Sequence, residues 1–180
     1  MNPQRAATAN ILGALALAVA GQLDTTEVSA GHAGSDTAAL SALDQFLDRP
    51  NVSRLCSVLG LSHSGTVRLL DRLGALGLVT RRSGVDGRTR AVTLTPQGRR
   101  AARRAAQSRA AYLDALLNDL SLSEIRTLHG LLARLMSQVV TSKYGGAWIC
   151  RRCDLRACGR DEGTCPAANA AAIKYPSTTT

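Results

Sequence analysis

Aromatic side chains are scarce in this chain of 180 residues, where Phe, Trp and Tyr together make up only 3%. This scarcity argues against modules that stack single-stranded bases on aromatic platforms. It also implies a core of Leu, Val and Ala, packed mainly as helices. Long apolar runs are missing too: none reaches the roughly 18 residues that a membrane-spanning helix needs, so an integral membrane protein is not expected. With 45% hydrophobic residues, the chain can still build the core of one domain with extensions.

Lysine is nearly absent from the basic residues, because 20 of the 22 are Arg, against 13 acidic residues. The positive charge is also unevenly placed. Residues 49–109 hold 13 Arg and only two acids, Asp71 and Asp86, whereas the rest of the chain has a net charge of −2. Clustered Arg releases condensed counterions from nucleic acids, although a run of charge can also be an ordinary solvated face. The distribution favours a polyanionic partner.

The N-terminal segment permits two interpretations. Residues 18–20 (Ala-Val-Ala) follow an apolar run and resemble the cleavage site of a secretory signal. However, the apolar residues keep a helical period beyond that point, which favours an amphipathic helix whose apolar stripe needs a partner. That stripe consists of Ile11, Leu12, Leu15, Val19 and Leu23.

Residues 24–36 are polar and Gly-rich and predict a loop. At its end, Ser35 or Asp36 is expected to cap a second helix that runs through Leu47. Gly60 tolerates positive φ and is expected to end a short third helix. Two residues can cap that third helix: Asn51 and Ser53.

A helix and a hairpin are expected next. Ser62 caps a fourth helix that runs to about Ala75. Residues 77–82 and 91–94 flank an Asp-Gly turn signal and predict a two-stranded hairpin. Pro follows Thr95 and marks the first position of a fifth helix. The last long helix opens with the capping box Ser121-x-x-Glu124 and keeps an apolar stripe of helical period.

The third and fourth helices match the spacing of a helix-turn-helix, in which the second helix buries one side and presents polar groups on the other. Val67, Leu70 and Leu73 are expected on the buried side. A plain helical hairpin is the alternative, but a basic two-stranded wing directly after the motif favours DNA binding. The residues expected at the DNA are Ser62, His63, Ser64, Thr66, Arg68, Arg72, Arg82 and Arg90.

These residues resemble the MarR family of bacterial winged helix-turn-helix regulators over about residues 8–142. The motifs that carry the resemblance are Leu61-Ser62-x-Ser64-x-x-x-Arg68-Leu69-x-Asp71-Arg72-Leu73, Gly77-Leu78-Val79, and Asp86-Gly87-Arg88 leading to Leu94-Thr95-x-x-Gly98.

The resemblance implies a homodimer held by intertwined N- and C-terminal helices, and a fourth helix that enters the major groove. It also implies that Arg88 is the wing-tip arginine in the minor groove and that Asp86 orients it. A narrow minor groove concentrates the negative potential that attracts Arg. Family members often bind small aromatic acids, but no residue set in this sequence identifies such a pocket, so the effector is unknown. An Arg cluster at residues 99–104 is expected either to touch phosphates or to keep its helix soluble.

A four-cysteine tail departs from the family pattern. Cys150, Cys153, Cys158 and Cys165 follow the spacing C-x2-C-x4-C-x6-C. Such thiols can close a structural zinc site, which replaces the core that a short tail cannot build. They can also hold an iron–sulfur cluster, and Pro166 after the last Cys is typical of bacterial cluster-binding runs. Redox-active thiols are the third alternative. Cys56 lies among apolar residues and is interpreted as an inert thiol.

The sequence thus predicts a mainly α fold with a small β wing. Its expected regions are an N-terminal dimerisation helix and loop (8–34), a winged helix-turn-helix domain (35–98), C-terminal dimerisation helices (99–142) and a Cys-rich metal or cluster tail (143–180). The predicted function is a cytoplasmic, homodimeric, sequence-specific regulator of pseudo-palindromic double-stranded DNA. By family analogy it is a repressor, with redox or ligand sensing as a further hypothesis.

Three rival interpretations remain. An enzyme is disfavoured, because four Cys ligands close a metal site and no His lies in a recognisable catalytic motif. A protein-interaction scaffold with a structural zinc tail predicts no salt-dependent duplex binding. A secreted protein would use the N-terminal segment as a signal and the tail as disulfides.

Overall fold

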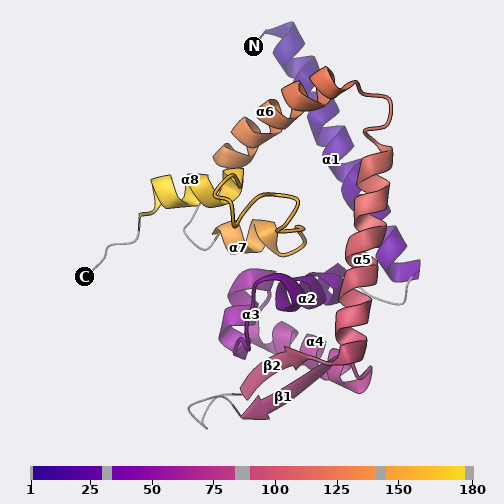
Figure 1. Ribbon diagram of the computed structural model, residues 1–180, viewed down its shortest axis with the longest axis vertical. Coiled ribbons are helices and arrows are strands. Elements are labelled where there is room, and N and C mark those ends of the chain that lie inside the picture. Colours follow the sequence, from indigo (N-terminus) through magenta and orange to yellow (C-terminus); the bar gives the residue numbers. More distant parts are fainter. Residues whose placement is uncertain (1, 30–33, 84–89, 141–144, 177–180) are drawn as a thin grey trace.

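The chain is mainly helical, with one small β hairpin (Figure 1). Its structure is a computed structural model that describes residues 2–29, 34–83, 90–140 and 145–176. The elements in chain order are α1 (Pro3–Ser29), α2 (Gly34–Gln45), α3 (Val52–Leu59), α4 (His63–Ala75), β1 (Val79–Ser83), β2 (Arg90–Leu94), α5 (Pro96–Ala115), α6 (Leu122–Val139), α7 (Gly145–Cys150) and α8 (Pro166–Lys174).

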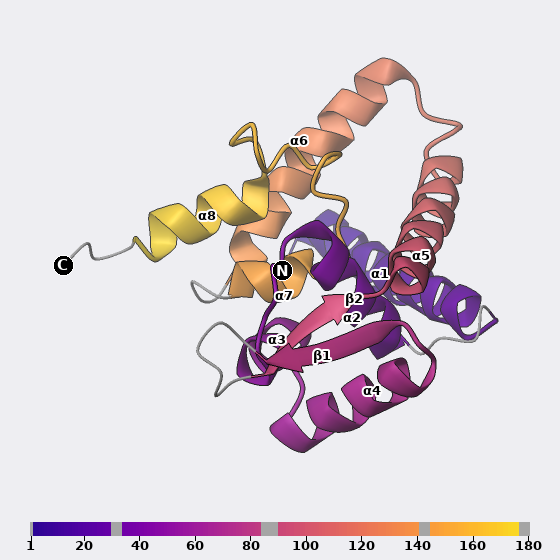
Figure 2. The same ribbon diagram turned by 60° about the horizontal axis from the view of Figure 1, so that its bottom comes forward.

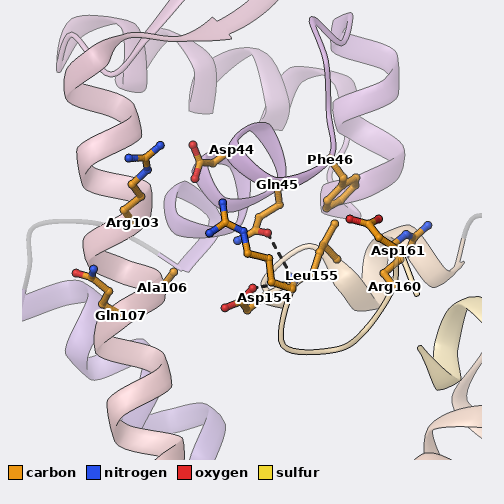
Figure 3. Close-up of a pocket in the computed structure, with 11 residues that line it drawn as sticks. Asp44, Gln45, Phe46, Arg103, Ala106, Gln107, Asp154, Leu155, Arg160 and Asp161 are labelled. Atoms are coloured by element: carbon orange, nitrogen blue, oxygen red, sulfur yellow. Dashed lines mark hydrogen bonds between the residues drawn. The ribbon is translucent and has the colours of Figure 1, made fainter. Parts of the chain in front are cut away.

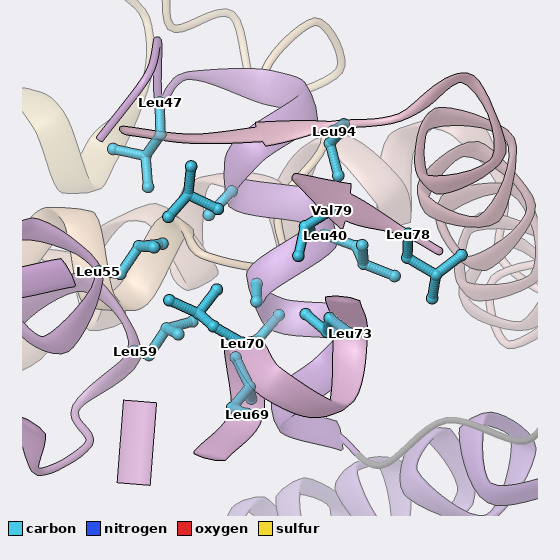
Figure 4. Packing of buried hydrophobic residues seen from close by; sticks show 14 of the residues in the cluster. Leu40, Leu47, Leu55, Leu59, Leu69, Leu70, Leu73, Leu78, Val79 and Leu94 are labelled. Carbon is cyan, nitrogen blue, oxygen red and sulfur yellow. The ribbon is translucent and has the colours of Figure 1, made fainter. Parts of the chain in front are cut away.

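Helices α2, α3 and α4 pack with the antiparallel hairpin into one winged unit (Figure 2). In the hairpin, Val79 of β1 faces Leu94 of β2. Aliphatic side chains from all of these elements fill the core, as the low aromatic content predicts (Figure 4). Burying each large aliphatic side chain contributes about 1.5–3 kcal/mol. The most deeply buried include Leu40, Leu55, Val58, Leu70, Leu73 and Val92. The predicted mainly α fold with a two-stranded wing is therefore confirmed.

Side-chain caps set where the helices of this unit begin. Asn51 accepts a hydrogen bond from the backbone N–H of Arg54 at the start of α3. Ser62 and Thr95 cap α4 and α5 in the same way. Each cap satisfies a backbone donor that has no partner inside its helix. Of the two residues expected to cap α3, Asn51 is the one that does so.

Geometry requires glycine at positions that shape the winged unit, among them Gly60 and Gly98. Gly60 ends α3 at φ 66°, the left-handed region that favours glycine. Gly98, in the first turn of α5, lies against the backbone carbonyl of Leu78, and a Cβ at this position would collide with it. This contact seats α5 on the base of the wing.

Helix α5 leaves the winged unit, and α6 folds back from its far end (Figure 1). The predicted capping box is present, because Ser121 and Glu124 exchange hydrogen bonds at the start of α6. Outside the winged unit, large apolar side chains remain exposed on α1 and α6: Ile11, Leu12, Leu15, Leu17, Leu122, Leu131, Leu132, Leu135 and Val139.

The N-terminal region differs from the prediction in two ways. Helix α1 runs to Ser29, so residues 24–29 are helical rather than part of a loop. No Gly or Pro lies between residues 22 and 29, so no backbone-breaking residue stops the helix there. Helix α2 begins at Gly34, which places Ser35 and Asp36 inside its first turn instead of at the cap.

The expectation that no segment is apolar enough to span a membrane is also wrong. Residues Pro3–Thr25 are long and apolar enough to cross a membrane by length and composition alone, with a mean hydropathy of 1.6. None of this apolar stretch is buried inside the chain. The core helix of a soluble protein and an N-terminal signal sequence pass the same criterion.

The Cys-rich segment forms a second core of its own between α6 and the winged unit. Helices α7 and α8 and the loop between them enclose it, and Lys174 of α8 donates to the carbonyls of Ser137 and Val140 at the end of α6. Phe46, just after α2, packs against both cores. The two cores therefore meet at this ring.

Candidate nucleic-acid interface and cysteine cluster

The leading end of α4 presents small polar and basic side chains to solvent. Ser62, His63, Ser64 and Arg68 are all exposed. The hydroxyl of Ser62 accepts from the N–H of Gly65 at 3.1 Å, which fixes the helix start. A helix N-terminus favours anions, because its first N–H groups lack partners and the helix dipole is positive there. This surface thus has the polarity that a phosphate backbone requires.

Thr66 does not belong to this surface. Its side chain is fully buried, and its hydroxyl donates to the carbonyl of Ser62 at 3.0 Å. The predicted DNA contact of Thr66 is therefore wrong. Helical spacing placed it near the polar face, but in the structure it is buried, as Leu69 is.

Arg72 is paired inside the protein. Its guanidinium forms a bidentate ion pair with Asp36 of α2: Nε lies 3.2 Å from Oδ2, and Nη2 contacts Oδ1. The Asp36 side chain is only 3% exposed, whereas that of Arg72 is 48% exposed. The sequence predicted that Arg72 contacts DNA and that Ser35 or Asp36 caps a helix. The structure instead shows a link that fastens α4 to α2.

A second ion pair fastens the wing. Arg81 of β1 lies 2.7 Å from Asp71 of α4 and also donates to the carbonyl of Val67 at 3.2 Å. The backbones of Arg82 and Arg90 lie in the hairpin strands, but their side chains fall outside the described part of the structure. Asp86 and Arg88 lie outside the described residues altogether. Their roles at DNA stay predictions.

A cavity of about 750 Å³ lies between α2, α5 and the Cys-rich loop (Figure 3). Arg103 projects from α5 beside Asp44 at the end of α2, and the loop supplies Asp154, Arg160 and Asp161. The predicted Arg cluster thus contributes one side chain to a charged cavity, and its members Arg99, Arg100, Arg103 and Arg104 are all exposed. The sequence gives no sign of this cavity, because five of its eleven lining residues come from the tail and the rest from α2 with the residue after it and from α5.

The four cysteines of the tail gather in the second core. Cys150 and Cys165 are buried, and Cys153 and Cys158 pack against them. All four are free thiols, as is the half-buried Cys56 of α3. The Sγ of Cys153 donates to the carbonyl of Ile149 at 3.9 Å, and the Sγ of Cys158 donates to the carbonyl of Leu155 at 3.4 Å. Among the described residues, however, no three His, Cys, Asp or Glu side chains already converge as a metal site.

Hydrogen bonding and charge give these thiols different acidities. A hydrogen bond from Cys150, aided by the charges of Arg109 and Arg160, lowers the pKa of Cys153 to about 6, although burial opposes this. The same hydrogen bond and burial raise the pKa of Cys150. Burial, the charge of Cys165 and its hydrogen bond raise the pKa of Cys158 to about 11. Near neutral pH, Cys153 is therefore the thiolate of its pair.

Comparisons with known proteins agree with this geometry. Residues 33–89 match the model of the MarR family. No curated protein matches the chain closely in sequence. Among solved structures, a MarR family protein from Bacillus stearothermophilus is similar at 23% identity, with a TM-score of 0.69 over 78% of this chain and 99% of that one.

Two further similar structures are of MepR, a transcription regulator of the Staphylococcus aureus multidrug efflux pump MepA. The first has 15% identity and a TM-score of 0.65 over 72% of this chain and 96% of MepR. The second is a MepR mutant bound to an oligodeoxyribonucleotide, with 16% identity and a TM-score of 0.56 over 73% of this chain and 96% of that one. Residues 33–89 thus resemble the MarR family, and the chain as a whole has the winged helix-turn-helix fold of these solved structures.

Proposed function

We propose that this chain is a sequence-specific, double-stranded DNA-binding transcription regulator that acts as a homodimer in the cytoplasm and represses its target genes. The observation that carries the proposal is the exposed leading end of α4, with Ser62, His63, Ser64 and Arg68 beside the basic hairpin. MepR, which shares the fold, is a transcription regulator, and one of its mutants binds an oligodeoxyribonucleotide.

In the proposed complex, α4 enters the major groove. Arg68 has the fork of donors that pairs with guanine O6 and N7, and the serines at the helix start suit a backbone phosphate. The wing then reaches the adjacent minor groove, where Arg88 is the residue expected to insert. Arg82 and Arg90 are expected to contact phosphates beside it. Repression follows if the bound dimer covers a promoter.

The exposed apolar faces of α1 and α6 support a homodimer. Leu17 is 78% exposed and Leu122 is 74% exposed in the single chain, and these two helices hold most of the exposed large apolar side chains. Such a concentration marks an interface rather than scattered surface residues. A two-fold dimer presents two α4 helices to half-sites about 34–36 Å apart, which suits a pseudo-palindromic operator. In this proposal a second copy, rather than a lipid bilayer, covers α1.

The experiment selects duplexes from a random pool with the purified full chain and then measures affinity by fluorescence anisotropy. We expect affinity to fall steeply between about 50 and 200 mM salt, because bound phosphates release counterions. Arg68→Ala is expected to weaken binding at least tenfold. Arg126→Ala is the matched control, because it removes the same charge from the exposed first turns of α6, far from the wing (Figure 1).

Equal losses for the two variants would mean that charge alone is measured. The absence of salt-dependent duplex binding would reject the proposal and favour a protein-interaction scaffold.

A further inference from the structure

We propose that the four tail cysteines bind one thiolate-ligated centre, a zinc ion or an iron–sulfur cluster, and that this centre holds Trp148 against the helix-turn-helix turn so that its loss weakens DNA binding. The binding site itself is independent of the proposed function, whereas the effect on DNA depends on it. The ligands are Cys150, Cys153, Cys158 and Cys165.

The backbone already brings the sulfurs together in two pairs. Cys150 ends α7, and a turn follows in which the N–H of Cys153 donates to the carbonyl of Cys150 at 2.9 Å. Cys165 stands at the N-cap of α8, and Cys158 packs against the same core while its Sγ donates to the carbonyl of Leu155 at 3.4 Å. The two pairs share one core, and none of the thiols forms a disulfide. Zinc and iron–sulfur clusters both take four cysteine thiolates.

The second core is too small to be stabilised by apolar side chains alone. Apart from the cysteines, its buried residues are Val140, Leu155 and three alanines. Small units of this kind usually need a disulfide or a metal, because burial cannot offset the conformational entropy lost on folding. Sulfur ligands pointing into such a core are the usual solution when no disulfide is present.

The charge around the cysteines also fits. Four thiolates on one zinc ion leave a net negative charge, and Nη1 of Arg160 already lies 3.6 Å from the sulfur of Cys150. Arg109 of α5 and Arg151 are further positive charges that act on Cys153. Hydrogen bonds and cations at the sulfurs stabilise a thiolate centre and tune the potential of a cluster.

Trp148 connects this segment to the helix-turn-helix. Its indole lies so close to Gly60 that a Cβ there would be 2.7 Å from Nε1. Arg151 holds the ring by stacking 4.1 Å from its centroid and by donating to the Trp148 carbonyl at 2.6 Å. Gly60 ends α3, and the residues that follow it lead directly into Ser62, the cap of α4. A shift of Trp148 would therefore be expected to move the turn that leads into α4, the proposed recognition helix.

The loop between the cysteines makes a second contact with the winged unit. The N–H of Leu155 donates to Oε1 of Gln45 at 3.3 Å, and Phe46 packs against both cores. Leu155 lies between the two cysteine pairs, so a centre that joins the pairs also fixes this loop against the end of α2. Loss of the centre would free both contacts at once.

The first test purifies the full chain without oxygen and measures zinc, iron and acid-labile sulfide, together with the visible spectrum. About one zinc per chain, or iron with matching sulfide and a brown colour, supports the proposal. Cys165→Ser is expected to lose the metal, whereas Cys56→Ser is expected to retain it. A metal-free protein, disulfides among the four cysteines, or equal metal content in both variants would overturn the proposal.

The second test uses Trp148, the single tryptophan of the chain, as a reporter. Removing the centre from the Cys56→Ser protein with a chelator is expected to shift its fluorescence. Re-adding zinc, or iron together with sulfide under reducing conditions if the centre is a cluster, is expected to restore it. Unchanged fluorescence would reject the link to the helix-turn-helix. This readout needs no DNA and does not depend on whether Cys165→Ser folds.

The third test compares operator affinity with and without the centre, where at least a tenfold loss is expected on removal. Trp148→Ala is expected to keep the metal but to bind DNA weakly in both states. Equal affinity of the loaded and metal-free proteins would overturn the coupling and leave the proposed function standing. Metal binding with a fluorescence response but no duplex binding would reject the proposed function and leave the metal site standing.

Discussion

The ion pair between Arg72 and Asp36 predicts that Arg72 stabilises the fold rather than contacting DNA, and the two roles can be distinguished by mutation. In the structure it joins α4 to α2, and the carboxylate is almost completely buried. We therefore expect Arg72→Ala to lower the free energy of unfolding, because it leaves a buried carboxylate without its charged partner. Hydrogen bonds to charged groups contribute about 1.5–3 kcal/mol. Arg72 is half exposed and screened by solvent, so we expect about 2 kcal/mol.

Arg72→Ala and Asp36→Ala should lower the free energy of unfolding by different amounts. Asp36→Ala leaves an arginine that can turn into solvent, so we expect a loss of only about 1 kcal/mol. The double variant should also lose about 1 kcal/mol, because no unpaired charge stays buried. The resulting coupling energy of about 2 kcal/mol is within the range for residues in direct contact. Arg72→Lys should be intermediate, since lysine keeps the charge but loses the bidentate fork.

Urea denaturation, monitored by circular dichroism, measures these differences in the free energy of unfolding. In thermal unfolding, the melting temperature of Arg72→Ala should be about 4–8 °C below that of the wild type for a chain of this size. Operator affinity measured well below the melting temperature gives an independent readout. If the stability losses of Arg72→Ala and Asp36→Ala add up to the loss of the double variant, the ion pair contributes nothing to stability. If Arg72→Ala instead keeps wild-type stability but weakens binding as much as Arg68→Ala, then Arg72 reads DNA and the anchoring argument fails.

Three further predictions follow from the packing. Gly98→Ala should unfold at markedly lower denaturant than wild type, because its Cβ meets the rigid carbonyl of Leu78; a wild-type midpoint would contradict the close approach. Ser62→Ala should cost about 1 kcal/mol through loss of the cap, and Ser62→Asp should recover it in denaturation experiments but repel DNA in anisotropy. Leu135→Glu, on the exposed face of α6, should yield folded monomers in light scattering; intact dimers would move the interface elsewhere.

Features that depend on neighbours in sequence could be predicted from the sequence. The cap at Ser62, the left-handed end of α3 at Gly60 and the capping box of α6 are all present as expected. Each is decided by a few adjacent residues, because a cap needs only one side-chain oxygen and a nearby N–H. The strand pairing also agrees with the prediction made from the Asp-Gly turn signal between residues 77–82 and 91–94. Local chemistry therefore predicted most of the winged unit.

Contacts between distant residues could not be predicted in this way. Asp36 and Arg72 are separated by 36 positions, and the periodicity of α4 says only that Arg72 lies away from Leu73. Thr66 shows the same limit, because a small residue can face either way and its neighbours in the fold decide. The contact of Trp148 with Gly60 joins two distant segments, and no local sequence pattern in either segment predicts it.

The ion pairs change how the basic stretch of residues 49–109 should be counted. Arg81 is paired with Asp71, which lies inside this stretch and is already counted, whereas Arg72 is paired with Asp36 of α2, which lies outside it and removes one further positive charge. A paired arginine releases few counterions from DNA, because it has no net charge to offer. Among the arginines of α4, Arg68 is therefore the one whose loss should reduce the salt dependence of binding, by about one unit of the log–log slope, whereas Arg72→Ala should leave that slope unchanged. In the proposed complex we therefore expect sequence specificity at the major groove to depend on Arg68 and on the short side chains before it. We expect the phosphate affinity to come mainly from the wing and from the exposed arginines of α5.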